Sequence, residues 1–149
     1  MHRRLVMIVF GLVLLALAVQ PASAQFDKAK DVKKHLEKKH DYRVSKEESY
    51  LSAKHDKWLN MTLREYKGGI LMRAYLETSQ YDRDDLEGLC NKLNYSATAA
   101  RMYIDNEDDL IFECWFPGKY DKDRFEALLE AWHNDTIGQA ATIQAELDM

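Results

Sequence analysis

Two alternating runs on either side of a Gly-Gly pair constrain the fold of this chain more than any other feature. In residues 58–66 and 70–76 apolar side chains recur at about every second position, and Lys67, Gly68 and Gly69 lie between the runs. A period of two places one face of a strand against a core, and glycine allows the chain to reverse within a few residues. The sequence therefore predicts a β-hairpin, and with it an antiparallel sheet.

Helical periodicity marks three other segments. Residues 26–39 carry a narrow apolar stripe among many lysines, which is typical of a weakly amphipathic helix. A second helix follows Asp82 or Asp84, either of which is able to cap it, and repeats apolar residues at i, i+3, i+4 and i+7. The strongest pattern begins after Asp121. Beyond Gly138 it either continues as helix or frays, because glycine lowers helix propensity.

The remaining segments complete an α+β pattern. Residues 42–44 and 50–54 have strand character, and residues 101–104 and 110–116 flank a polar cluster that suits a hairpin loop. We therefore expect an antiparallel sheet of four to five strands with flanking helices, in the order α-β-β-β-α-β-β-α.

Residues 1–24 have the pattern of a cleavable secretory signal peptide. Arginines near the start precede an apolar run over residues 5–19, and small residues end at Ala24. A run of fifteen residues is shorter than the roughly 20 that a permanent membrane span needs. We expect cleavage after Ala24, which leaves residues 25–149 as one domain, periplasmic or secreted, with no membrane span.

The processed chain is expected to be acidic. Cleavage removes two of the 21 basic residues and none of the 25 acidic ones, which leaves 19 against 25 and a net charge of −6. An acidic surface repels phosphate groups, so the sequence predicts no nucleic-acid partner.

A family resemblance spans residues 33–135. Residues 90–94 (CNKLN) end a helix at an asparagine, residues 100–105 (ARMYID) form a strand ending in Asp, residues 109–113 (DLIFE) form a strand ending in Glu, and a helix closes the series. The order and spacing of these segments resemble the YbjN-type domain, a family labelled as bacterial sensory transduction regulators. The resemblance implies a type III secretion chaperone-like fold and a possible homodimer, and it brings no catalytic residues. The signal peptide sets this chain apart from the commoner cytoplasmic members.

The histidines do not predict a metal site. His35 and His40 are five residues apart, so on a continuous helix they point about 140° apart. His55 and His133 have no acidic or cysteine partner at ligand spacing. The sequence therefore predicts surface histidines, with no metal and no cofactor.

Cys90 and Cys114 leave two alternatives open. Cys90 lies on the apolar stripe of its helix and Cys114 on the apolar face of its strand, so both are expected to point into the helix–sheet interface. In an exported protein they could form a disulfide that stabilises the fold by about 3 kcal/mol in the chain-entropy model. The alternative is two buried free thiols that act as small hydrophobes.

The strand aromatics are the candidate interaction surface. Tyr66, Tyr75, Tyr103 and Trp115 include positions that alternate out of register with the apolar core residues, which places them on the opposite strand face. Exposed aromatic area on that face needs cover. Either the first or last helix covers it, or a partner or a second copy of the chain does.

No motif in the sequence indicates catalysis. The cluster at residues 105–109 lacks the glycine and glutamate of a calcium loop and is expected to be a solvated turn. Gly-x-Ser-x-Gly, phosphate-binding glycine loops and Cys-x-x-Cys are also missing from the sequence. We expect an exported, non-enzymatic binding, accessory or regulatory protein with a protein partner that the sequence does not identify. The alternative is a small periplasmic hydrolase or metal-dependent enzyme, for which His133 near the acidic turn is the single candidate.

Overall fold

The computed structural model describes residues 26 and 28–147, so the expected signal peptide at residues 1–24 lies outside the described residues. The elements in chain order are α1 (Ala29–Lys39), β1 (Arg43–Lys46), β2 (Tyr50–Lys54), β3 (Met61–Tyr66), β4 (Gly69–Leu76), α2 (Arg83–Ser96), β5 (Arg101–Ile104), β6 (Leu110–Phe116), α3 (Lys122–Ile137) and α4 (Ala140–Leu147). Among the described residues, no helix is long and apolar enough to cross a bilayer.

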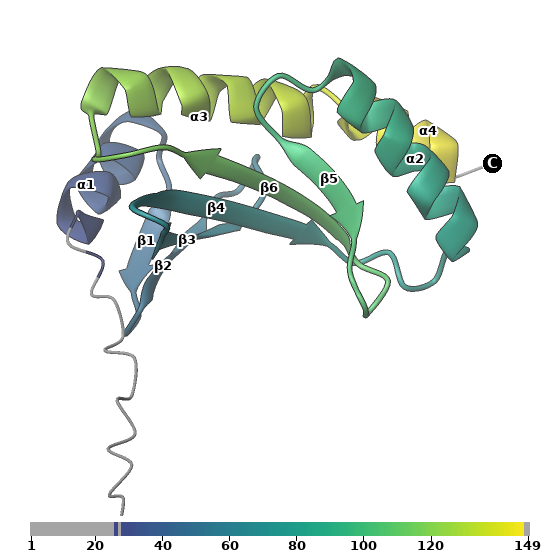
Figure 1. The fold of residues 1–149 in the computed structure, drawn as a ribbon, viewed down its shortest axis with the longest axis horizontal. Helices are drawn as coiled ribbons and strands as arrows, with labels where there is room; N and C mark the ends of the chain where they lie inside the picture. The colour runs from purple at the N-terminus through teal and green to yellow at the C-terminus, as the bar shows by residue number, and fades with distance from the viewer. Residues whose placement is uncertain (1–25, 27, 148–149) are drawn as a thin grey trace, which may run out of the picture.

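The strands form one antiparallel sheet in the order β1-β2-β3-β4-β6-β5. β1 to β4 follow one another as a meander, and β6 then pairs with β4, which leaves β5 at the far edge. The helices pack on one face of this sheet (Figure 1). The expected α+β class is confirmed, but the sheet has six strands instead of four to five, because Arg43–Lys46 forms a strand of its own beside β2.

The predicted hairpin joins β3 to β4 through a turn at Lys67 and Gly68. Their φ values are 48° and 72°, and two successive positive φ values are the mark of the type I′ turn that suits two-residue hairpins. Gly69 is already the first residue of β4. A Cβ atom on Gly69 would lie 2.2 Å from the carbonyl oxygen of Phe116 and 2.7 Å from Nε1 of Trp115, so only glycine fits there.

A single cluster of buried side chains fills the space between the sheet and the helices. Inward-facing residues from all six strands take part, and α1, α2, α3 and α4 supply the other side. The largest fully buried side chains are Trp132, Phe112, Phe116 and Phe125. Burial of this apolar area is the main stabilising contribution to the fold.

Both expected N-caps are present. The side chain of Asp82 accepts a hydrogen bond from the backbone N–H of Asp84 (2.9 Å), and Asp121 accepts one from that of Arg124 (3.0 Å). Each carboxylate satisfies a backbone donor that the first turn leaves free. After Gly138 the chain forms a separate short helix, α4, so it neither continues α3 nor frays there.

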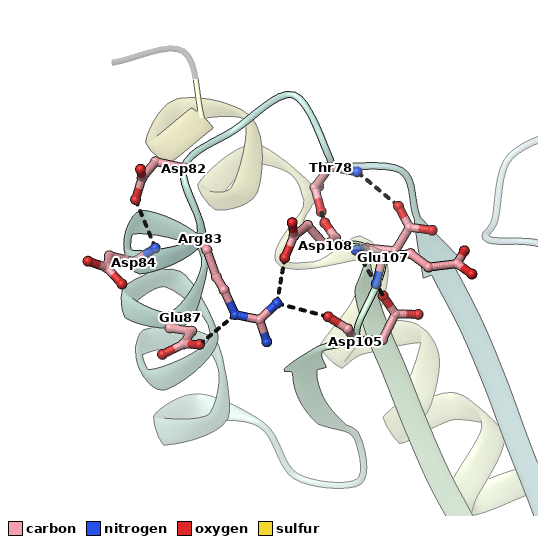
Figure 2. A network of polar contacts seen from close by, with 9 residues as sticks. Thr78, Asp82, Arg83, Asp84, Glu87, Asp105, Glu107 and Asp108 are labelled. Carbon is pink, nitrogen blue, oxygen red and sulfur yellow. Dashed lines mark hydrogen bonds and ion pairs between the residues drawn. The ribbon is translucent and has the colours of Figure 1, made fainter.

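The acidic turn between β5 and β6 is tied to α2 (Figure 2). Asp105 accepts a hydrogen bond from the backbone N–H of Glu107, as in an Asx turn (2.8 Å). Arg83 of α2 donates to the carbonyl of Asp105 and pairs with the carboxylate of Asp108, and the hydroxyl of Thr78 donates to the carbonyl of Asp108. The turn that we expected to be merely solvated is therefore a fixed contact between the hairpin and α2.

Asn94 closes the free edge of the sheet at β5. Its side-chain amide donates to the carbonyl of Met102 and accepts from the N–H of the same residue, both at 2.8 Å. These two bonds replace the partners that a neighbouring strand would supply. They protect the edge from pairing with another chain.

Asp135 fastens α3 to the loop between α2 and β5. The side chain is buried (4% exposed), and its carboxylate accepts hydrogen bonds from the backbone N–H groups of Thr98, Ala99 and Ala100 at 2.6–3.0 Å. Three converging backbone donors around one carboxylate form a small anion-binding nest.

We expect Asp135→Ala to lower the free energy of unfolding by about 3 kcal/mol, because it leaves three partly buried donors without their charged acceptor. Chemical denaturation followed by circular dichroism measures the change. The exposed neighbour is the matched control, and Asn134→Ala should change stability by less than about 0.5 kcal/mol. Equal effects of the two substitutions would contradict a specific role for the carboxylate.

Candidate functional site

The sheet face opposite the helices is the candidate functional site, and we call its outward-pointing strand residues the open face. Tyr66, Tyr75, Tyr103 and Trp115 all belong to it. Tyr75 is 68% exposed and Trp115 46%, whereas Tyr103 is half-buried. In the described part of the chain the helices pack on the other face of the sheet (Figure 1). The first and last helices therefore do not cover the aromatic residues of the open face.

Trp115 is held in a fixed position on the open face. Its Nε1 atom donates a hydrogen bond to the carbonyl of Tyr66 (3.1 Å) across the glycine that begins β4. Trp115 also lies opposite Leu71 in the β4–β6 register, and Leu71 is only 4% exposed although it points outward. The indole therefore stays partly exposed, while the side chain of Leu71 beside it is covered.

An ion-pair network occupies the middle of the open face. Glu113 of β6 pairs with Arg73 of β4 (Nε to Oε2, 2.6 Å) and with Arg101 of β5 (2.8 Å). The guanidinium of Arg101 also lies over the ring of Tyr103, 5.1 Å from its centre. The network fixes the arginines and separates the Trp115 end of the face from the Tyr75 end.

The open face has the opposite charge to the chain as a whole. The chain has a formal net charge of −4. The charged outward residues of the strands are one carboxylate, Glu113, and five cations: Arg43, Lys54, Arg64, Arg73 and Arg101. Surfaces rich in tyrosine, tryptophan and arginine are typical of protein–protein interfaces. A net positive surface favours an acidic partner.

The expectation of surface histidines is wrong for three of the four that it covered. His35, His40 and His133 are 6%, 8% and 8% exposed. The spacing argument assumed a continuous helix, but α1 ends at Lys39 and Asp41 has a φ of 55°. The chain therefore turns at His40, and the imidazole of His40 comes round to the side of His35.

Both imidazoles meet one carboxylate of α3. The Nε2 atoms of His35 and His40 each contact Oε2 of Glu126. The distance from Nε2 of His40 to this oxygen is 2.9 Å. Nδ1 of His35 lies 2.8 Å from the hydroxyl of Tyr120, and Nζ of Lys39 lies 3.4 Å from Oε1 of Glu126. Glu126 lies 91 residues after His35. No sequence spacing signals such a pairing, so the sequence analysis missed it.

The surroundings shift the pKa values of Glu126 and His35. Burial alone would raise the pKa of Glu126, but hydrogen bonds from His40 and His35 outweigh it and lower that pKa to about 2. Burial lowers the pKa of His35, against the opposing effect of Glu126. At neutral pH the carboxylate is ionised and the imidazole of His35 favours its neutral form.

His133 does not lie at the acidic turn where the sequence analysis placed it. Its ring packs against Trp58, with ring centres 3.6 Å apart, and its Nε2 atom lies 3.1 Å from the hydroxyl of Tyr42. Burial lowers the pKa of His133 to about 4. The residue therefore belongs to the aromatic packing near α1 and has no acidic turn beside it.

Cys90 and Cys114 are buried in the helix–sheet interface as free thiols. Burial raises the pKa of Cys90 to about 11 and that of Cys114 to about 12. Neither sulfur is activated as a nucleophile, because the thiolate is the reactive form.

Comparison with known proteins identifies the fold. No protein-family profile and no curated protein sequence matches the chain. Among solved structures, YbjN from E. coli, described as a proposed transcription regulator, aligns with a TM-score of 0.59 at 12% identity, over 71% of this chain and 83% of its own. An uncharacterized protein from Methanothermobacter thermautotrophicus aligns with a TM-score of 0.56 at 11% identity, over 79% and 97%. The chain therefore has a YbjN-like fold, and the resemblance expected from the sequence is confirmed at the level of the fold.

We expect the folded protein to show no reaction with a thiol reagent at about pH 8, because burial keeps both sulfurs protonated and covered. Adding denaturant without reductant should release two reactive thiols per chain, which a colorimetric thiol assay counts. Cys114→Ala is the control and should release one. If the denatured protein showed no thiols until a reductant was added, the two cysteines would be bonded to each other.

Proposed function

We propose that this chain is an exported, non-enzymatic accessory or regulatory protein that binds an acidic protein through the open face. The observation that carries the proposal is the composition of that face, which combines exposed tyrosine and tryptophan with five cations on an otherwise acidic chain. A monomer in solution has no structural need for such a surface. Interfaces between proteins are enriched in these residue types.

The charge of the open face also argues against a second copy of this chain as the partner at that face. A symmetric dimer through this face would set the cations of one copy against those of the other, and like charges across an interface cost several kcal/mol. An acidic partner protein meets the same cations with opposite charge. The homodimer that the family resemblance implies would therefore need another surface.

A protein partner suits the proposed compartment. YbjN from E. coli is described as a proposed transcription regulator, which supports a regulatory or binding role for this fold over an enzymatic one. The basic start and apolar run of residues 1–24 support export. An exported chain meets proteins rather than chromosomal DNA, so we assign the open face to a protein.

The histidine contacts add support for a non-enzymatic role. Within residues 28–147, the hydrogen-bond partners of the histidine ring nitrogens are tyrosine hydroxyls, Glu126 and backbone N–H groups. None of these partners is a serine, threonine or cysteine side chain. The described structure thus assembles no nucleophile–base pair of the kind that hydrolases use.

Photo-cross-linking tests the open face. We expect a photoreactive phenylalanine analogue at Tyr75 to capture a discrete partner in cells that produce the protein, and the same analogue at Tyr95, which is 95% exposed on α2, to capture none. Arg64→Glu should lower the yield of the adduct about tenfold, because it reverses one charge of the face.

The charge control is Lys30→Glu on α1, which should leave the adduct unchanged. The mass of the adduct identifies a second copy of the chain, and a nuclease treatment identifies nucleic acid. Either of these, or equal capture at the two tyrosine positions, would contradict an acidic protein partner at the open face.

Export has its own test. We expect the protein from the periplasmic fraction to begin at Gln25 in intact-mass spectrometry, because signal peptidase requires small residues at the first and third positions before the cut. Ala24→Phe should block processing, whereas Ser23→Phe, at the tolerant position between them, should not. A chain that keeps Met1 and stays in the cytoplasm would show that residues 1–24 are not an export signal.

A further inference from the structure

The contact between α1 and α3 holds a group of side chains that the open face does not use. His35, His40 and Glu126 each offer one ligand atom, and these atoms all lie within 4.8 Å of one another. The side chains of the two histidines are 2% and 9% exposed, and that of Glu126 is 20% exposed. Two buried imidazoles and one partly exposed carboxylate therefore bring their ligand atoms close together.

The orientation of the two rings brings their Nε2 atoms to the same place. The two imidazoles are stacked almost in parallel, with an interplanar angle of 6° and centres 5.7 Å apart. Both direct Nε2 toward the same oxygen of Glu126, while the other oxygen is left to Lys39. Two donors on one carboxylate oxygen are ordinary hydrogen bonding, but the same convergence also brings the three ligand atoms close enough to share one ion.

We propose that His35, His40 and Glu126 form a binding site for a divalent transition-metal ion, with Zn²⁺ as the best-fitting ion. Two imidazole nitrogens with one carboxylate oxygen are a common protein donor set for zinc, and nitrogen donors select it over Mg²⁺ and Ca²⁺. Three protein ligands leave the fourth tetrahedral position to a water molecule.

The distances need only a small adjustment. Ligand atoms about 2.1 Å from a tetrahedral ion lie about 3.4 Å from one another. The contact of His40 with Glu126 is 2.9 Å, so the carboxylate must withdraw by less than about 1 Å. Glu126 is a flexible side chain with an exposed edge, and its movement requires no change in the backbone.

Tyr120 is placed to orient one of the ligands. Its hydroxyl lies 2.8 Å from Nδ1 of His35. When Nε2 binds a metal ion, the proton of the neutral imidazole resides on Nδ1, and a hydrogen bond from Nδ1 to an oxygen fixes the ring in that state. Tyr120 is therefore a positioning residue of the proposed site.

Two hollows border the proposed site. A hollow of about 370 Å³ is lined by His35, Tyr120 and Lys39, and another of about 390 Å³ is lined by His40, His55 and Trp58. Each hollow therefore reaches one of the two imidazoles. Binding would join the end of α1 to α3 through the metal, beyond the packing that already holds them.

Calorimetric titration of the purified protein, without a polyhistidine tag, tests the site. We expect one equivalent of Zn²⁺ to bind, with no heat from Mg²⁺ or Ca²⁺, and Zn²⁺ to raise the Tm. His40→Gln and Glu126→Gln should each weaken Zn²⁺ binding about a hundredfold while circular dichroism shows an unchanged fold. Tyr120→Phe should weaken it about tenfold, within the range for partners that orient a ligand.

The control is Glu130→Gln, which alters an exposed carboxylate of the same helix outside the group and should leave zinc affinity unchanged. Absence of Zn²⁺ binding to the wild-type protein would overturn the proposal and leave a hydrogen-bonded cluster only. Equal affinity of wild type, His40→Gln and Glu126→Gln would also overturn it, because zinc would then bind elsewhere. The cross-linking test of the open face is independent, since that face lies on the other side of the sheet.

Discussion

The ladder between β4 and β6 is the contact on which the rest of the structure depends. It joins the N-terminal meander to the C-terminal hairpin through seven residue pairs, from Ile70 opposite Phe116 to Leu76 opposite Leu110. Antiparallel pairing fixes which side chains share a face, so this register alone sets Arg73 beside Glu113 on the open face. A slip of one residue would move the aromatic residues into the core and the core residues into solvent.

Much of the fold could be predicted because it rests on local chemistry. The type I′ turn needs positive φ at Gly68, and the helices begin at aspartates whose side chains satisfy free backbone donors. β1 was not counted separately because its four residues include only one buried side chain, Val44, which is too few to show a period of two. The pairing of β4 with β6 joins segments far apart in the chain, and local pattern contains no information about it.

The two candidate sites differ in predictability for the same reason. The open face follows from alternation within each strand, so Tyr103 and Trp115 could be assigned to it from sequence alone. The histidine group depends on where α1 ends and on a glutamate 91 residues away. A helix that continued past Lys39 would have directed His40 away from His35, and the positive φ of Asp41 marks the change of direction. The histidine group is therefore set by tertiary structure, whereas the open face is set by the periodicity of the strands.

The helix layer gives the open face its rigidity. α3 is fastened near its beginning by Glu126, which meets α1, and near its end by Asp135, which binds the loop before β5. Between these two carboxylates, Phe125, Leu129 and Trp132 are fully buried against the sheet. A sheet held in this way meets a partner without first having to order its strands, and preorganisation lowers the entropic cost of binding. An ion on Glu126 would strengthen the first of these two fastenings, so the proposed metal site would stabilise the surface that we propose for partner binding.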